Sequence, residues 1–211
     1  MTTATRQAAA PQISLDLPED WRRVPVAPDG DRRGQQSLVH DWLGEPRTTA
    51  ASEAVIRMLV TESRRASRDG VAFAAVLLDL LPEPEVALLA GSLTLAFRPL
   101  PGVTDPALAA QGALATLASQ GCGRYPTRRA ELVGLAADPT RPAALVREQH
   151  LTGDVQMSVS QVLWLVPGTS HLGALAVSTP NRQLAREFTE VALQVASSLR
   201  VGIPASDMAC T

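Results

Sequence analysis

Apolar and polar residues alternate along much of the chain, and the two-residue period of this alternation predicts β-strands. Residues 12–17 read Gln-Ile-Ser-Leu-Asp-Leu, and residues 21–26 form a second short predicted strand. Residues 71–81 are almost wholly apolar, which is typical of a central strand covered on both faces. In the strand predicted over residues 86–98, the alternation runs on even positions before Gly91 and on odd positions after it. Because a slip by one residue turns side chains to the other face, we expect a β-bulge at Gly91.

The second half of the chain contains four more predicted strands, over residues 131–137, 143–151, 154–166 and 171–178. A Pro-Gly-Thr-Ser turn joins the last two strands as a hairpin. Consecutive hairpins imply an antiparallel sheet. Within it we expect Ala143–Leu151 to be an exposed edge strand that could pair with a partner.

Three helices are predicted from caps and from hydrophobic positions at helical spacing. They run from Thr48 or Thr49 to about Arg68, from Asp105 to about Ser119, and from Thr179 or Asn181 to Gly202. The last has the clearest apolar stripe, formed by Leu184, Phe188, Val191, Ala192, Val195 and Leu199. Residues 27–34 are expected to form a loop, and residues 36–42 either a strand or a helical turn.

The order of these elements predicts an α+β fold, in which two to three α-helices cover an antiparallel β-sheet. The chain has 211 residues, which favours one domain. We expect a single α+β domain over residues 12–202, a disordered N-terminal segment over residues 1–11 and a flexible tail over residues 203–211.

Two short motifs lie at the ends of the predicted domain: Ile13–Trp21, a strand with a Pro-x-x-Trp turn, and Val177-Ser-Thr-Pro-Asn181, followed by the helix that ends at Arg200. They resemble the first strand, and the last strand with the closing helix, of the PsbP-like fold. The resemblance covers residues 12–200 in element order. The family includes photosystem II extrinsic subunits, a small Ran-binding nuclear-import factor and actinobacterial lipoproteins. It implies an α/β/α sandwich that binds a partner and has no catalytic residues to transfer.

Composition narrows the possible chemistry. The formal net charge is −2 and the pI about 5.9, which argues against a nucleic-acid-binding protein. All 19 basic residues are arginine, which excludes a phosphate-loop lysine, a Schiff-base lysine and a lysine general base. The bias toward Ala, Leu, Val, Arg and Pro is typical of a GC-rich genome, and together with the family resemblance it suggests an actinobacterial source.

We expect a cytoplasmic protein, because the sequence shows neither a signal peptide nor an apolar run long enough to span a membrane. The two cysteines, Cys122 and Cys210, do not form a disulfide framework. A disulfide between them is the less favoured alternative in a cytoplasmic chain.

The three histidines, His40, His150 and His171, lack metal-ligand spacing. We interpret them as ordinary surface or capping residues. His40 and Asp41 could form an oriented base, but neighbouring residues of a strand point to opposite faces. We therefore predict no catalytic, cofactor-binding or metal-binding residue.

Cys122 lies at the most site-like point of the sequence, in Gly121-Cys-Gly-Arg-Tyr125. The cations of Arg124, Arg128 and Arg129 would favour its thiolate form. No positioned base accompanies it, so that we favour an ordinary loop cysteine over a nucleophile. The alternative is a ligand pocket, whose polar groups would be Cys122, Arg124, Tyr125 and His171.

Arginines gather in one quarter of the chain, at Arg124, Arg128, Arg129, Arg141 and Arg147. Guanidinium forks suit carboxylate or phosphate partners, but the interleaved Glu131, Asp138 and Glu148 favour a solvated surface. Other acidic residues are also expected in solvent, namely Asp16, Glu19, Asp20, Glu83 and Glu85. Trp21 and Trp164 are expected to be core anchors.

The favoured function is a non-enzymatic, protein-binding accessory or adaptor module, such as a chaperone or a component of a secretion system or another multi-protein assembly. We expect a protein partner, no cofactor, no nucleic acid and no membrane insertion. The alternative is a small-molecule-binding protein or enzyme with a site near Cys122.

Overall fold

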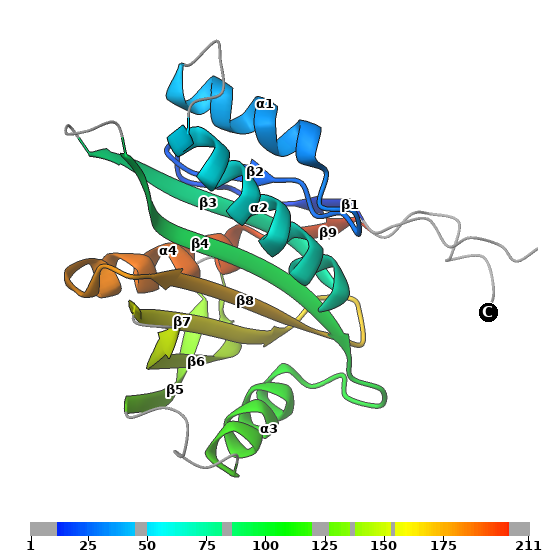
Figure 1. Cartoon of the computed structure of the whole chain (residues 1–211). Coiled ribbons are helices and arrows are strands. Elements are labelled where there is room, and N and C mark those ends of the chain that lie inside the picture. Colours follow the sequence, from blue (N-terminus) through cyan, green and yellow to red (C-terminus); the bar gives the residue numbers. More distant parts are fainter. Residues whose placement is uncertain are drawn as a thin grey trace, which may run out of the picture.

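A computed structural model of the chain describes residues 12–44, 50–81, 86–119, 127–135, 138–152 and 155–202 (Figure 1). Seven strands form an antiparallel sheet in the spatial order β2-β3-β4-β8-β7-β6-β5. They are β2 (Arg22–Val24), β3 (Val71–Leu81), β4 (Val86–Pro99), β5 (Thr127–Leu135), β6 (Asp138–Thr152), β7 (Val155–Leu165) and β8 (His171–Thr179). The helices of the described part are α1 (Arg32–Leu43), α2 (Ala50–Arg68), α3 (Pro106–Ser119) and α4 (Ala185–Ser198), with a 3₁₀ turn η2 (Arg182–Leu184) before α4. The predicted α+β class, an antiparallel sheet covered by helices, is confirmed.

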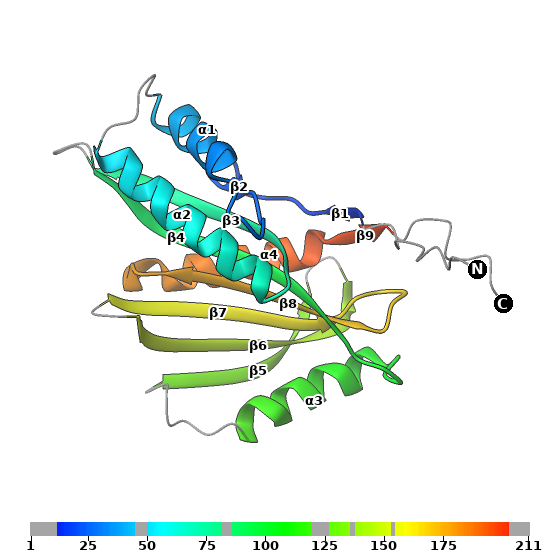
Figure 2. The same cartoon turned by 45° about the vertical axis from the view of Figure 1, so that its right-hand side comes forward.

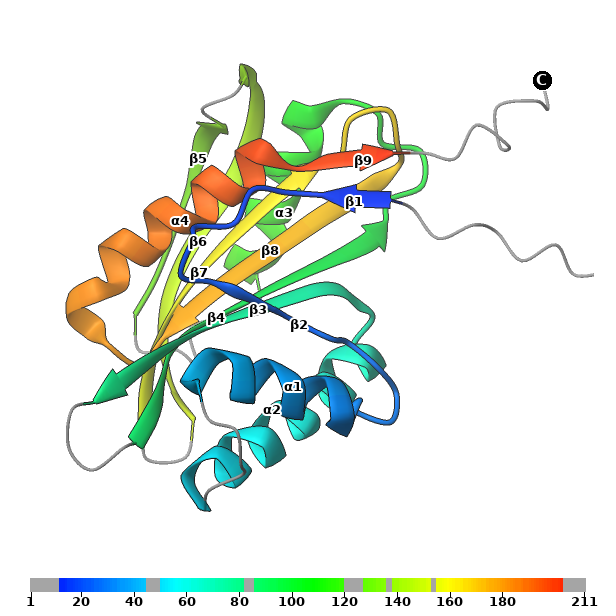
Figure 3. The same cartoon turned by 90° about the horizontal axis from the view of Figure 1, so that it is seen from above.

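Helices cover both faces of the sheet (Figures 2 and 3). One face carries α4 together with two short strands, β1 (Gln12–Ser14) and β9 (Arg200–Gly202), which pair with each other. We call it the α4 face. The other face carries α1 and α2 over β2, β3 and β4, and α3 over β6 and β7. Each face therefore has its own hydrophobic core.

Strand β3 is buried on both sides, as its apolar sequence predicts. Phe73 and Ala75 lie in the core under α4, whereas Ala74 and Val76 lie in the core under α1 and α2. All four residues are at most 9% exposed. The period of two along a strand assigns alternate residues to the two cores.

The bulge predicted at Gly91 is present beside that residue. Leu77 pairs with Gly91 and Leu78 with Leu89, which leaves Ala90 as the extra residue of β4. The Thr179 hydroxyl at the end of β8 donates a hydrogen bond of 2.6 Å to the Ala90 carbonyl oxygen. The carbonyl of the bulge therefore has a partner in spite of the broken pairing.

Two helix starts follow the predicted caps. The Asp105 carboxylate accepts a hydrogen bond of 2.8 Å from the Ala107 N–H at the start of α3. The Asn181 side chain accepts one of 3.1 Å from the Gln183 N–H and so caps η2. The predicted stripe of α4 packs into the core in full, and its members are Leu184, Phe188, Val191, Ala192, Val195 and Leu199.

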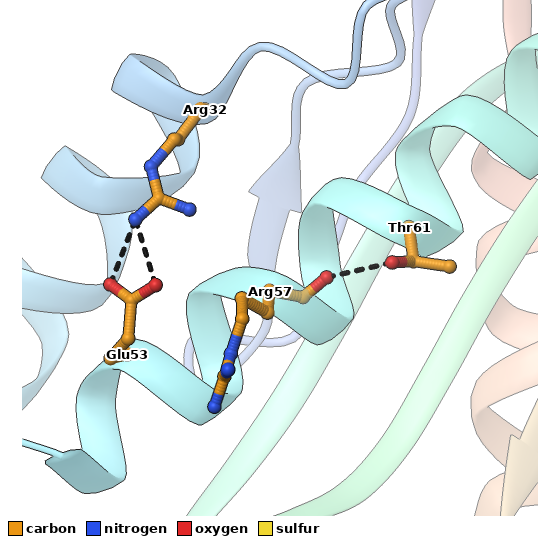
Figure 4. Close-up of polar contacts among 4 residues, drawn as sticks. All are labelled: Arg32, Glu53, Arg57 and Thr61. Carbon is orange, nitrogen blue, oxygen red and sulfur yellow. Dashed lines mark hydrogen bonds and ion pairs between the residues drawn. The ribbon is translucent and has the colours of Figure 1, made fainter.

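The first helix begins earlier than expected. Residues 36–42 are helical, and α1 starts at Arg32, inside the predicted loop, with Asp31 as its cap. Packing against α2 favours the helical conformation, because Val39 is fully buried in the core beneath these helices. Arg32 Nη2 also donates to both carboxylate oxygens of Glu53 on α2, at 2.8 and 2.9 Å (Figure 4). The same view shows the hydroxyl of Thr61, which donates to a carbonyl one turn earlier in α2.

The last helix ends earlier than expected, so that the predicted end at Gly202 is wrong. Leu199 has an extended ψ of 127° after α4, and its side chain is 5% exposed. Residues 200–202 then pair with residues 12–14 as β9. Pairing with the distant β1 is a long-range contact that helical periodicity does not report.

The predicted edge strand Ala143–Leu151 is wrong. It belongs to β6, which lies between β5 and β7. The edge is β5, which is longer than the segment predicted there and pairs with β6 from Thr127 onward. The charged residues at the start of β5 concealed this extension in the sequence.

Candidate functional site

An open cleft of about 790 Å³ lies on the α4 face, between α4 and the strands β5, β6 and β7. The helix forms one wall, and β5 and β6 form the other. Its lining includes four arginines, Arg129, Arg147, Arg182 and Arg186, three glutamates, Glu131, Glu148 and Glu190, and Ser158. The half-buried Val133 and Leu193 and the buried Leu145 supply apolar surface between these groups. We call it the arginine cleft.

One row of residues crosses the arginine cleft from the sheet edge to the helix. Arg129 of β5 pairs directly with Arg147 of β6, and Arg147 pairs with Ser160 of β7. The Ser160 hydroxyl is hydrogen-bonded to that of Thr189 on α4 at 2.6 Å. Directly opposite residues have Cβ atoms only about 4.5–5.5 Å apart, so that like charges at this spacing destabilise a sheet. The side chains of Arg129 and Arg147 therefore leave neighbouring strands directly opposite each other, on the same face of the sheet.

The carboxylates of the cleft neutralise only part of its positive charge. Arg147 forms an ion pair with Glu131, and Arg186 forms one with Glu190 at 3.4 Å. Arg129 and Arg182 have no ion-pair partner among the described residues. The cleft therefore has an excess of cationic groups, although the chain as a whole carries a net charge of −2.

The floor of the cleft contains a buried hydroxyl without a partner. Ser158 is 7% exposed, and its Oγ has no hydrogen-bond partner in the described part of the chain. Ser160, two residues along the same face, has its hydroxyl bonded to Thr189. Burying an unsatisfied hydroxyl costs about 1–3 kcal/mol. A group that enters the cleft could supply the missing partner of Ser158.

Arg128 and Glu148 belong to the opposite face. They pair directly across β5 and β6, with Arg128 Nη2 at 3.0 Å from Glu148 Oε2, and their side chains are 12% and 13% exposed. Arg128 Nη1 also donates to the Leu117 carbonyl oxygen at 3.1 Å. Through this hydrogen bond, the nearly buried Arg128 connects the last turn of α3 to the sheet. The strand period of two thus divides the arginines that sequence proximity grouped together.

Arg141 is not among the residues that line the cleft. Arg141 lies on β6, and its Nε and Nη2 are buried without a hydrogen-bond partner. Arg124 lies outside the described residues, as do Cys122, Tyr125, Asp138's side chain, Glu83 and Glu85. The pocket hypothesis for Cys122 therefore stays a prediction, with only an exposed His171 described from its four residues.

The remaining candidates lie apart from one another. His40 and Asp41 are on α1 instead of a strand, and the side chain of His150 on β6 lies outside the described part. In the described part, no group of three or more His, Cys, Asp or Glu residues is placed to hold a metal ion. Asp16, Glu19 and Asp20 are exposed, as predicted. Trp21 and Trp164 are 6% and 1% exposed, which confirms both as core residues.

A second groove, of about 550 Å³, lies on the opposite face between α3 and the strands β4, β8 and β7. Its floor consists of small residues, among them Ala96, Ala174 and Ala176. Leu108 of α3 lines it and is 62% exposed. The groove is mostly apolar, and Arg98 is the one charged residue of its described lining.

Sequence reasoning missed three residues of the arginine cleft, namely Ser158, Arg182 and Arg186. The two arginines are four residues apart, Arg182 in η2 and Arg186 in the first turn of α4, and both lie outside the apolar stripe. That spacing was visible in the sequence. That these arginines line the cleft follows from the position of α4 beside β5 and β6, which only the fold shows.

None of the helices in the described part is long and apolar enough to cross a membrane. Comparison with protein-family models and with curated proteins gives no match.

The solved structures similar to the chain include the following three. LpqN of Mycobacterium tuberculosis, described as involved in cell envelope biogenesis, is 13% identical, with a TM-score of 0.45 over 94% of this chain and 87% of LpqN. A protein from Bacteroides thetaiotaomicron VPI-5482 is 11% identical, with a TM-score of 0.45 over 89% of this chain and 44% of the other. The Ran-binding protein Mog1p of Saccharomyces cerevisiae is 13% identical, with a TM-score of 0.40 over 64% of this chain and 83% of Mog1p. At these values the likenesses assign no family, so that the PsbP-like resemblance stays a prediction and function is argued from this chain's own geometry.

Proposed function

We propose that the chain is a non-enzymatic, protein-binding accessory or adaptor module of the cytoplasm, formed by residues 12–202 as one domain. It binds its partner by adding a strand of the partner to the free edge of β5. One observation carries this proposal: β5 is nine residues long, and among the described residues a strand pairs with it on one side only.

A free strand edge presents unpaired N–H and C=O groups, which form a ready template for a strand of another protein. β2, at the other end of the sheet, has three residues, so that it offers far fewer such groups than β5. Leu132 in the middle of β5 is 49% exposed and offers an apolar contact beside the backbone groups. Length and apolar exposure together favour β5 as the docking edge.

Proline substitutions at neighbouring residues test this edge. In an antiparallel strand the N–H groups of successive residues point alternately toward the partner strand and away from it. Of Ala130→Pro and Glu131→Pro, one therefore removes an N–H bonded to β6 and loses stability, and the other removes an N–H on the free edge. Glu131→Gln is the matched control, because it loses the ion pair with Arg147 and keeps the backbone donor.

The measurement is quantitative co-purification from native lysate of the source organism, with thermal unfolding of each variant. We expect wild type and Glu131→Gln to recover the same stoichiometric protein. The proline variant that keeps its melting temperature should lose that protein. Repeated recovery of the chain alone, or equal recovery by that proline variant, would contradict the proposal.

A further inference from the structure

We propose that the arginine cleft is a binding site for carboxylate groups of an acidic, extended segment of the partner protein. This inference rests on the proposed protein-binding function and names the chemistry of the partner. Three observations carry it: the facing pair Arg129 and Arg147, the unpartnered hydroxyl of Ser158, and the position of β5 as both cleft wall and sheet edge.

The described carboxylates neutralise only one of the two arginines that lie opposite each other. Arg129 and Arg147 pair directly across β5 and β6, and Glu131 forms an ion pair with Arg147 alone. A carboxylate placed between the two guanidinium groups would accept hydrogen bonds from both and remove their repulsion. Guanidinium forks form strong, charge-assisted bonds of this kind. The arrangement is unfavourable in the free protein and becomes favourable when an anionic group binds.

Ser158 supplies an independent indication of a ligand. Its side chain is buried in the floor of the cleft and has no hydrogen-bond partner within the described part. A hydroxyl can donate to a carboxylate oxygen, and the donor here is already desolvated. The neighbouring Ser160 is held by Thr189, so that it does not compete for an incoming group.

The spread of the cationic groups favours a peptide segment over a compact anion. Arg129 lies on β5, whereas Arg182 lies before α4 on the other wall of the cleft. The strands β5 and β7 are two strand spacings apart, which is about 10 Å. The apolar residues Val133, Leu145 and Leu193 lie among the cationic groups. Separate carboxylates on a chain that also carries apolar side chains match this mixed lining.

Strand addition at β5 would bring such a segment to the cleft. An added strand lies about 4.8 Å from its neighbour, and every second side chain shares a face with the neighbour's side chains. Alternate residues of a segment on β5 would therefore lie on the α4 face, beside Arg129. Acidic residues at those alternate positions would reach Arg129 from the edge. Ser158 lies two strands further in, on β7, and would be reached by a part of the segment that leaves β5 and crosses the cleft.

The test uses two fluorescently labelled peptides of equal length, one of alternating Glu and Val and one of alternating Gln and Val. Fluorescence anisotropy with the full chain gives both affinities. Each charge-assisted bond gained should strengthen binding by about tenfold or more, so that the Glu peptide binds at least about tenfold more tightly. Raising the salt concentration should weaken the Glu peptide and leave the Gln peptide nearly unchanged.

Variants of cleft residues test whether the Glu peptide binds in the arginine cleft. Arg129→Gln and Ser158→Ala should each weaken the Glu peptide severalfold without changing the affinity for the Gln peptide. Arg65→Gln is the matched control, because Arg65 is an exposed arginine of α2 with a carboxylate partner at 3.9 Å, far along the sheet from β5. Its affinity for both peptides should equal that of wild type. Arg129 is exposed, so that its variant is expected to fold, and thermal unfolding checks both cleft variants.

The outcomes separate the two proposals. Equal affinity for both peptides, or an unchanged affinity of Arg129→Gln for the Glu peptide, overturns the carboxylate site while strand addition at β5 stands. Loss of both peptides in the edge proline variant supports strand addition independently of the arginines. Inorganic phosphate that displaces the Glu peptide at a similar concentration from wild type, but not from Arg129→Gln, would make the cleft a site for free anions and overturn the acidic segment as its occupant.

Discussion

The ring of Phe188 on α4 occupies the space that a side chain on Gly91 of β4 would need. A Cβ atom built on Gly91 would lie 2.7 Å from Cζ of that ring, below the 3.0 Å that real Cβ contacts respect. The φ of Gly91 is not in the left-handed region, so that the ring and not the backbone requires glycine here. Phe188 in turn lies 5.7 Å from the ring of Trp21, between centroids. One glycine beside the bulge therefore lets α4 approach the sheet closely enough to bury two aromatic rings.

Replacement of Gly91 by alanine tests this contact. The added methyl group must displace a ring that is 6% exposed, so that the free energy of unfolding should fall by about 1–3 kcal/mol. Gly112→Ala is the control, because its Cβ on α3 would meet nothing within 4 Å. Alanine in a helix interior should raise stability by about 0.5–1 kcal/mol. Urea unfolding measures both changes, and equal stabilities of the two variants would contradict the close approach.

The hydroxyl of Thr179 supports the bulge from β8. It donates to the Ala90 carbonyl oxygen at 2.6 Å and accepts from the Asn181 N–H at 3.0 Å, and Thr179 is fully buried. Thr179→Val keeps the shape and leaves both backbone groups without this partner, which should cost about 1–3 kcal/mol. Thr179→Ser keeps the hydroxyl and should lose less. Thermal unfolding of both variants measures this, and a loss in Thr179→Ser as large as that in Thr179→Val would contradict the predominant role of the hydroxyl.

Local sequence signals predicted the bulge but not the reason why residue 91 is a glycine. The shift of the hydrophobic period at Gly91 is visible in neighbouring residues of one strand, and the structure confirms it. Phe188, which explains the glycine, is almost a hundred positions away along the chain. In the same way, the stripe of α4 was predictable because it lies within one helix, whereas the pairing of β9 with β1 was not.

The candidate site was predictable only in part for a similar reason. Arg129 and Arg147 were noticed as members of an arginine-rich region, together with Arg128. The register of β5 and β6 places Arg129 and Arg147 on one face of the sheet and Arg128 on the other. Register is a pairing between residues well separated along the chain, such as Arg129 with Arg147, which the local pattern of either strand does not report. Arg182 joins them only through the packing of α4.

Removal of one partner from the nearly buried ion pair of Arg128 and Glu148 should cost more stability than removal of one partner from an exposed pair of the chain. Arg128→Met leaves a nearly buried carboxylate without its cation, which should lower the free energy of unfolding by about 3 kcal/mol. The double variant Arg128→Met with Glu148→Met should recover most of this loss. Arg186→Gln breaks a pair with side chains 88% and 67% exposed, so that its effect should be below about 0.5 kcal/mol. Urea unfolding of the four proteins completes the comparison. A double variant as unstable as Arg128→Met would contradict this account.

Two serines on the same face of β7 should respond in opposite directions to alanine. Ser158→Ala removes a buried hydroxyl that lacks a partner, so that stability should rise by up to about 1 kcal/mol. Ser160→Ala breaks the bond to Thr189 and should lower stability by about 1 kcal/mol. Differential scanning calorimetry of the two variants is sufficient. A loss of stability in Ser158→Ala would indicate that its hydroxyl has a partner in solution, such as an ordered water.

Arg129→Gln should make the free protein more stable. The substitution removes one of two cations that face each other across β5 and β6, and it leaves the ion pair of Arg147 and Glu131 intact. Relief of a like-charge pair on neighbouring strands should raise the free energy of unfolding by about 0.2–1 kcal/mol at low ionic strength. The gain should shrink as salt is added, because these exposed charges are screened. Urea unfolding at two salt concentrations measures it, and a loss of stability at low salt would show that Arg129 has a stabilising partner. A gain in stability together with weaker binding of the acidic peptide would mean that Arg129 is retained for recognition at the expense of stability.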